Sequence, residues 1–250
     1  MVCFNCLFNQ DCSYAISTTS NIKVFREFKA CNYWHVSQNI ITRNGKLHGL
    51  EILSRPVYFS GDIFFSLDDY FKSLSQVKHK QLVMEVMDKI HYFHRNNEIV
   101  NYFINVERVS LLDDDVIRKL LRINKYLQNK GGVLTVEVTQ RNPELSLFTK
   151  EAKYRLKDDG IKIALDKFDT KNFDISALKF YDYIKFDCKS LMKKRIDNGF
   201  TSDFVHFLYN LVEMKVSTVA ERVETKDEYN YVMELPFTHL QGFYEIKNNT

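Results

Sequence analysis

Short apolar runs and amphipathic segments alternate along most of this 250-residue chain. A short apolar run bounded by turn residues is typical of a buried strand, and apolar residues at helical spacing indicate a helix. The clearest run, 161–165, follows Asp159-Gly160 and ends at Asp166. Runs of this kind predict strands at 34–41, 48–54, 100–106, 133–138, 161–166, 182–187, 216–221 and 238–243.

Helical spacing fills the intervals between these strands. It predicts helices at 21–31, 66–71, 76–95, 113–130, 143–157, 175–180, 202–214 and 226–234. Asn44-Gly45 separates the first two strands, and this dipeptide is the strongest short signal of a β-hairpin. The first strand should therefore run antiparallel to the second.

Strands that alternate with helices form parallel sheets with crossover helices. Eight strands in a chain of this length predict a (β/α)8 TIM-like barrel, here with an antiparallel first strand. We expect a leader at 1–18 and one domain at 19–250. Because few residues follow the last strand, we expect an uncovered groove there, filled by the helix around Phe25 and Phe28 or by a partner's helix.

Composition narrows the possible compartment and partners. The net charge of +3 is too small to indicate a nucleic-acid surface. No secretory signal and no apolar stretch of membrane-spanning length is evident, so we expect a cytoplasmic protein without a membrane partner. Cys3 and Cys6 have the spacing that begins some small metal sites, and reduced cytosolic thiols are the simpler interpretation.

Polar side chains stand in or directly after most of the predicted apolar strands. Buried charges are unfavourable unless they are paired or bind metal, so such residues point to a common site. Oxygen ligands without His or Cys favour hard cations such as Mg²⁺ or Mn²⁺, although a structural polar network in the barrel is an equal alternative. The residues are Glu51, Asn105, Glu137, Asp166, Lys185, Asp187, Glu221 and Gln241.

These strand ends resemble, in order, the motifs of EAL domains, a family that hydrolyses cyclic di-GMP. Glu51-Ile-Leu53-Ser-Arg55 is similar to the signature Glu-x-Leu-x-Arg, and the resemblance extends over about residues 20–247. The other matching segments are Phe103-Ile-Asn105, Val136-Glu137-Val-Thr139, Ile163-Ala-Leu-Asp166, Ile184-Lys185-Phe-Asp187, Val219-Ala-Glu221-Arg-Val-Glu224-Thr225 and Leu240-Gln241-Gly242, with Gln38 at the family's Gln-Pro-Ile.

The resemblance implies a two-metal phosphodiesterase site, in which paired cations stabilise the attacking and leaving oxygens. It assigns the first metal to Glu51, Asn105, Glu137 and Asp166, with Asp166 bridging to the second metal, and it counts Asp187 among the metal residues. Lys185 would steady the attacking water, and Glu221 would complete the second-metal side. Arg55, Gln38 and Gln241 would face the ligand, and Glu224 would anchor the loop that follows Asp166.

Departures from the family motif fall on the second metal. The family's second Asp is Lys167 here, and an ammonium offers no lone pair to a cation. The loop's two glycines are replaced by Asp169 and Lys171, and Gln140 replaces a Glu. We therefore predict at most a vestigial Mg²⁺ or Mn²⁺ site, no required cofactor, and little or no hydrolysis.

Three functions are compatible with this pattern. The first is a degenerate EAL-like regulator that represses a transcription activator by protein contact. Its resemblance to stand-alone EAL proteins of this type suggests the flagellar master activator of the FlhDC kind, without direct contact to DNA and without dependence on cyclic di-GMP. The others are a phosphodiesterase of reduced activity and a non-hydrolysing cyclic di-GMP sensor. Candidate apolar anchors for a partner are Tyr58, Phe59, Phe64 and Phe65.

Overall fold

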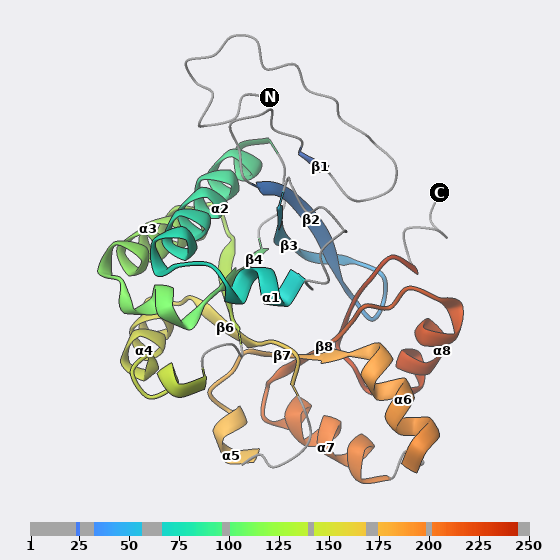
Figure 1. Cartoon of the computed structure of the whole chain (residues 1–250). Coiled ribbons are helices and arrows are strands. Elements are labelled where there is room, and N and C mark those ends of the chain that lie inside the picture. The colour runs from blue at the N-terminus through green and yellow to red at the C-terminus, as the bar shows by residue number, and fades with distance from the viewer. Residues whose placement is uncertain are drawn as a thin grey trace.

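A closed barrel of strands surrounded by helices forms the described part of the molecule (Figure 1). The computed structural model describes residues 24–25, 33–56, 67–96, 101–139, 143–168, 175–198 and 202–244. The sheet's strands follow one another in sequence order, and β2 also pairs with β9. The leader at 1–18, the first cysteines, the aromatic residues of 58–65 and the loop glycine positions 169 and 171 lie outside the described residues.

The hairpin β2–β3 opens the barrel. Tyr33–Thr42 (β2) pairs antiparallel with Leu47–Pro56 (β3), and Gly45 takes a left-handed φ of 77° in the turn between them. A glycine adopts this conformation without the steric cost of a side chain. The hairpin predicted from Asn44-Gly45 is therefore confirmed.

From β3 to β9, each strand runs parallel to the next. The strands after β3 are Asn101–Val106 (β4), Val133–Val138 (β5), Lys162–Leu165 (β6), Tyr183–Asp187 (β7), Ser217–Glu221 (β8) and His239–Gln241 (β9). Ile40 of β2 lies opposite Gln241 of β9 in an antiparallel pair, and this pairing closes the ring. The predicted barrel with an antiparallel first strand is confirmed.

Helices cover the outside of the ring (Figure 1). Asp113 caps the helix after β4 because its side chain accepts hydrogen bonds from the N–H groups of Asp115 and Val116. Thr225 and Glu228 form a capping box at the start of the last described helix. The α-helices are Leu67–Lys72 (α1), Gln76–Asn96 (α2), Asp114–Gln128 (α3), Lys150–Asp158 (α4), Ile175–Leu178 (α5), Cys188–Asn198 (α6), Ser202–Glu213 (α7) and Lys226–Glu234 (α8), with short 3-10 helices at Arg108–Leu112 and Pro143–Leu145. None of the helices in the described ranges has the length and apolar composition that a membrane crossing needs.

The barrel interior is filled in layers. One buried layer contains Ile40, Phe103, Ala164, Tyr183 and Val219. Side chains two residues apart on a strand point to the same face. The next layer along the parallel strands therefore holds the polar residues predicted from the sequence, namely Asn105, Asp166, Lys185 and Glu221, with Gln38 on the antiparallel strand.

Three predicted elements differ from the structure. The helix expected at 21–31 is wrong for Val24–Phe25 (β1), which forms a short strand paired with β2; the rest of that segment lies outside the described residues. The single helix expected at 143–157 is a 3-10 turn followed by α4. Helix α6 was not predicted, because its sequence has no continuous apolar stripe.

Candidate functional site

A lysine surrounded by carboxylates occupies the C-terminal end of the barrel, which we call the barrel mouth. The Nζ atom of Lys185 lies 2.9 Å from Glu51 Oε2, 3.0 Å from both carboxylate oxygens of Glu137, and 3.5 Å from Glu221 Oε2. Lys185 is 1 % exposed. The barrel thus joins side chains from β3, β5, β7 and β8 around one ammonium group.

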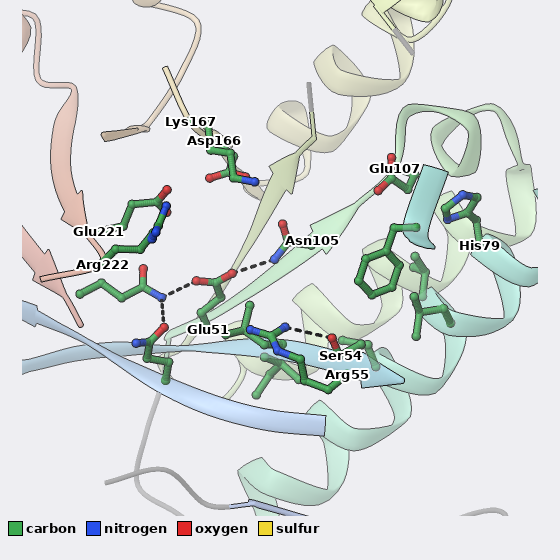
Figure 2. Close-up of a pocket in the computed structure, with 18 residues that line it drawn as sticks. Glu51, Ser54, Arg55, His79, Asn105, Glu107, Asp166, Lys167, Glu221 and Arg222 are labelled. Atoms are coloured by element: carbon green, nitrogen blue, oxygen red, sulfur yellow. Dashed lines mark hydrogen bonds between the residues drawn. The ribbon is translucent and has the colours of Figure 1, made fainter. Parts of the chain in front are cut away.

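Amide side chains donate to both oxygens of Glu51, and one of these oxygens is shared with Lys185. Asn105 Nδ2 donates a hydrogen bond of 2.7 Å to Glu51 Oε1, and Gln241 Nε2 donates to Glu51 Oε2. Gln241 Nε2 also donates to Gln38 Oε1 at 3.1 Å. Figure 2 shows the bond between Asn105 and Glu51. The structure therefore brings Gln38, Gln241 and Asn105 together around Glu51, as the order of the strand ends led us to expect.

The carboxylates around Lys185 differ in their proton affinity. Burial, and then repulsion from Glu51, raises the pKa of Glu137 well above its ordinary value, although Lys185 opposes this shift. Burial also raises the pKa of Glu221 to about 7. Burial acts in the same direction on Glu51, but the charge of Lys185 and the hydrogen bonds from Gln241 and Asn105 outweigh it and lower the pKa of Glu51.

Lys185 remains a cation in this arrangement. Burial disfavours its charged form, but the neighbouring carboxylates, Glu137 and Glu51 foremost, outweigh burial and raise its pKa well above the ordinary value. Its ammonium protons point to carboxylate oxygens rather than to solvent. Lys185 therefore acts here as a counter-ion that links four strands, and its protonated amine cannot act as a base toward a water molecule.

A cavity of about 270 Å³ opens above this network. Arg55 lines it, and the Arg55 Nη1 atom donates to the carbonyl oxygen of Ser54 at 3.0 Å (Figure 2). Apolar residues of α1, α2 and β3 form one wall of the cavity, and polar and charged residues of the barrel mouth form the other. The cavity could accept a ligand with both an apolar and an anionic part. Its polar lining includes Gln38, Glu51, Asn105, Glu107, Asp166, Lys167, Glu221, Arg222 and Gln241.

Two basic residues stand directly after strand-end carboxylates at the rim of this cavity. Lys167 follows Asp166 with a φ of 49°, and Arg222 follows Glu221 with a φ of 61°. The Arg222 Nη1 atom lies 2.5 Å from Asp187 Oδ2. Asp187, expected among the metal ligands, is thus paired with an arginine to which the sequence analysis assigned no role.

Glu224, the predicted loop anchor, lies away from the carboxylate network. Its Oε2 atom is 2.6 Å from Lys189 Nζ, and its backbone N–H donates to Glu228 Oε2 at 2.7 Å. The loop that it would anchor, beyond Phe168, lies outside the described residues. Its predicted role therefore stays a prediction.

Sequence reasoning missed two residues of the cavity wall. Glu107 follows β4, is 7 % exposed, and accepts a hydrogen bond of 2.6 Å from Thr139 Oγ1. His79 lies on α2 and is 4 % exposed. Glu107 directly follows the Asn105-Val106 strand end, so its position was the available signal; nothing local to His79 indicated that it would face the cavity.

The side chains as placed do not fit a pair of divalent metals. The donor types of Glu51, Asn105, Glu137 and Asp166 suit Mg²⁺ or Mn²⁺, but both oxygens of Glu51 and of Glu137 already accept bonds from ammonium or amide groups. Asn105 turns its amide nitrogen, not its oxygen, toward Glu51. Within the described ranges, no three His, Cys, Asp or Glu side chains are grouped so as to hold a metal ion.

Comparisons with known proteins agree with this fold. In the solved complex of Klebsiella pneumoniae BlrP1 with calcium and cyclic di-GMP, the similar region covers 86 % of this chain and 55 % of BlrP1, with a TM-score of 0.65 and 18 % identity. An EAL domain protein from Listeria monocytogenes has a TM-score of 0.62 and 16 % identity, covering 86 % of this chain and 87 % of that one. At these identities the likeness shows the fold alone.

Sequence comparison adds the family. The probable cyclic di-GMP phosphodiesterase PdeG of Escherichia coli (strain K12) is 29 % identical over 150 residues, which are 58 % of this chain and 29 % of PdeG. The chain thus spans less than a third of that relative's length. The model of the EAL domain family matches residues 26–247, which is most of the chain. With the barrel, its antiparallel first strand and the ordered strand-end motifs, this match shows that the chain belongs to the EAL domain family.

Proposed function

We propose that this chain is a non-hydrolysing EAL-like regulator that acts through protein contact. The observation that carries the proposal is the cation at position 167, beside Asp166, where the resemblance implies a carboxylate ligand for the second metal. An ammonium cannot coordinate a cation, and its charge repels one. Hydrolysis by the two-metal route requires both ions, so the loss of one removes several kcal/mol of transition-state stabilisation.

The closed carboxylate network supports the same conclusion. Lys185 donates hydrogen bonds to the carboxylates of Glu51 and Glu137, so the oxygens that accept these bonds are not available as metal ligands. Such internal ion pairs can stabilise the barrel fold even where no reaction is catalysed. The protein would then act through binding at its outer surface, and we propose a transcription regulator as the partner. The flagellar master activator is the candidate that the resemblance suggests.

The direct test combines purified components. The unmodified protein, incubated with cyclic di-GMP and Mn²⁺, should give no linear product above the rate of a reaction without protein. Mixed with the purified flagellar master activator, it should co-elute in size-exclusion chromatography and abolish the activator's shift of promoter DNA. Turnover of cyclic di-GMP, or separate elution of the two proteins, would end this proposal.

A variant separates docking from the former active site. Replacing Glu51 and Glu137 by Gln keeps the shape of both side chains, and repression of motility should persist if the variant's circular dichroism matches the parent. The charge-matched control replaces Asp88 and Asp115, surface residues of α2 and α3, by Asn. If the folded Glu variant lost repression and the control did not, repression would depend on the carboxylates of the barrel mouth.

A second candidate function rests on the cavity. Arg55, Gln38 and Gln241 all line it, and a guanidinium suits a phosphate oxygen geometrically. A sensor that binds cyclic di-GMP without cleaving it would use these residues. Calorimetric titration with cyclic di-GMP in EDTA favours this candidate if heat is released by the unmodified protein and lost in the variant Arg55→Met.

A further inference from the structure

Left-handed backbone at basic residues marks the barrel mouth. Three non-glycine residues in the described ranges have positive φ, namely Lys167, Arg222 and Lys215. Lys215 is explained by helix termination, since its N–H donates to Val212 O and the next N–H donates to Leu211 O at the end of α7. Lys167 and Arg222 end no helix, and both line the cavity.

The two remaining residues share one local design. Each directly follows a strand-end carboxylate, Asp166 or Glu221. In each case the next N–H donates to the neighbouring strand, from Phe168 to Lys185 O at 2.9 Å and from Val223 to Gln241 O at 3.1 Å. Both turns therefore hold a basic residue at the rim of the cavity. Its backbone has a left-handed conformation that residues other than Gly, Asn and Asp rarely adopt.

The basic side chains lie next to the carboxylates that a metal would need. Arg222 Nη1 is 2.5 Å from Asp187 Oδ2, and Figure 2 shows Arg222 beside Glu221. Lys167 directly follows Asp166 at the same rim, and both residues line the cavity (Figure 2). With Lys185 between Glu51 and Glu137, an internal cation accompanies each predicted acidic ligand.

We propose that Lys167 and Arg222 are built-in counter-ions that close the barrel mouth to divalent metal ions. This inference deepens the proposed function and rests on it. When all groups are charged, five carboxylates face the three cations Lys167, Lys185 and Arg222, which leaves a formal charge of −2. The carboxylates are those of Glu51, Glu137, Asp166, Asp187 and Glu221. With Asp at 167 and Gly at 222, six carboxylates would face Lys185 alone, which leaves −5. Two divalent cations, with a total charge of +4, would leave −1 in the second arrangement and +2 in the first.

The expected effect on metal affinity is large. One unit charge about 5 Å from a divalent ion changes its dissociation constant by roughly tenfold to a few hundredfold at the effective dielectric of a partly exposed site. Lys167 and Arg222 are both exposed, so about tenfold applies to each unit of charge. Lys167→Asp changes two units of charge and Arg222→Gly one, so the double variant should bind a divalent ion about a thousandfold more tightly, and Arg222→Gly alone about tenfold more tightly.

The experiment compares Mn²⁺ binding by four forms of the full chain. They are the unmodified protein, Arg222→Gly, the double variant Lys167→Asp with Arg222→Gly, and the control Lys215→Gly, which relieves the same backbone conformation (φ 62°) outside the cavity. Free Mn²⁺ is measured by electron paramagnetic resonance, and the thermal midpoint is followed with and without millimolar Mn²⁺. Circular dichroism reports whether each variant folds.

Weak or absent Mn²⁺ binding in the unmodified protein and in Lys215→Gly, with about thousandfold tighter binding and a higher midpoint in the double variant, would support the inference. Equal Mn²⁺ binding by the unmodified protein and the double variant would overturn it. If the double variant does not fold, Arg222→Gly must bind Mn²⁺ about tenfold more tightly than Lys215→Gly, or the inference fails. Mn²⁺ binding by the unmodified protein without turnover of cyclic di-GMP would remove only this inference, whereas turnover would remove the proposed function.

Discussion

Replacing Lys185 by Met tests the barrel mouth most directly. Met keeps the length of the apolar stem and removes the ammonium group. Lys185 is 1 % exposed, and its Nζ lies 2.9 Å from Glu51 and 3.0 Å from Glu137, so both carboxylates would lose their cation inside the protein. Breaking a buried ion pair by removing one partner costs about 3–5 kcal/mol. We expect a loss of that size in the free energy of unfolding at pH 7.

Urea unfolding followed by circular dichroism measures this loss. The control is Lys119→Met, because Lys119 pairs with Asp88 at 2.5 Å on the surface, where such a pair contributes about 0–1 kcal/mol. The deficit of Lys185→Met should also depend on pH. Burial raises the pKa of Glu137 and of Glu221, and both would rise further without the lysine, so protonation relieves the repulsion as pH falls.

The deficit should therefore be smaller at pH 5 than at pH 8. The reasoning is refuted if Lys185→Met loses no more stability than Lys119→Met. It is also refuted if the deficit is equal at the two pH values, because the loss would then come from packing rather than from uncompensated charge.

Two further predictions concern the opposite end of the barrel and its last strand. Burial, followed by the charge of His48, lowers the pKa of His239 from 6.5 to about 4, so the folded state loses stability as pH falls from 6.5 toward 4. In His239→Gln, about 2–3 kcal/mol of this acid-induced loss in the free energy of unfolding should disappear. An unchanged dependence of stability on pH would contradict this. A Cβ at Gly242 would overlap the backbone of Val223, whereas one at Gly45 meets nothing within 4 Å. Gly242→Ala should therefore lower the thermal midpoint several times more than Gly45→Ala, whose cost is about 1 kcal/mol of left-handed strain; equal midpoints would argue against the tight contact.

Local sequence determined the strands and most helices of this protein. Barrel strands are buried on both faces, so β4, β5 and β7 are each mostly apolar, with a polar side chain near the C-terminal end. Asn44-Gly45 fixed the antiparallel start. The order of polar strand ends also indicated one shared site, because the carboxyl ends of parallel strands meet at the same edge of a barrel.

Short segments with mixed patterns were not determined locally. Val24 and Phe25 have a spacing that suits a helix, but pairing with Val36 and His35 of β2 makes them a strand. Helix α6 carries few apolar residues, and it is held by the contacts of Cys188 and Leu191 with neighbouring elements rather than by an amphipathic face of its own.

The pairing of charges in the barrel mouth follows from the folded barrel and not from the local sequence. Lys185 meets Glu51, which is 134 positions away in the chain, and Arg222 meets Asp187 across 35 positions. Such pairs depend on the closure of the ring by β2 and β9 and on the left-handed turn at Arg222, and no local pattern encodes either. Residue types along the sequence could therefore indicate that acidic side chains gather, but only distances in the folded barrel show which cation each of them holds.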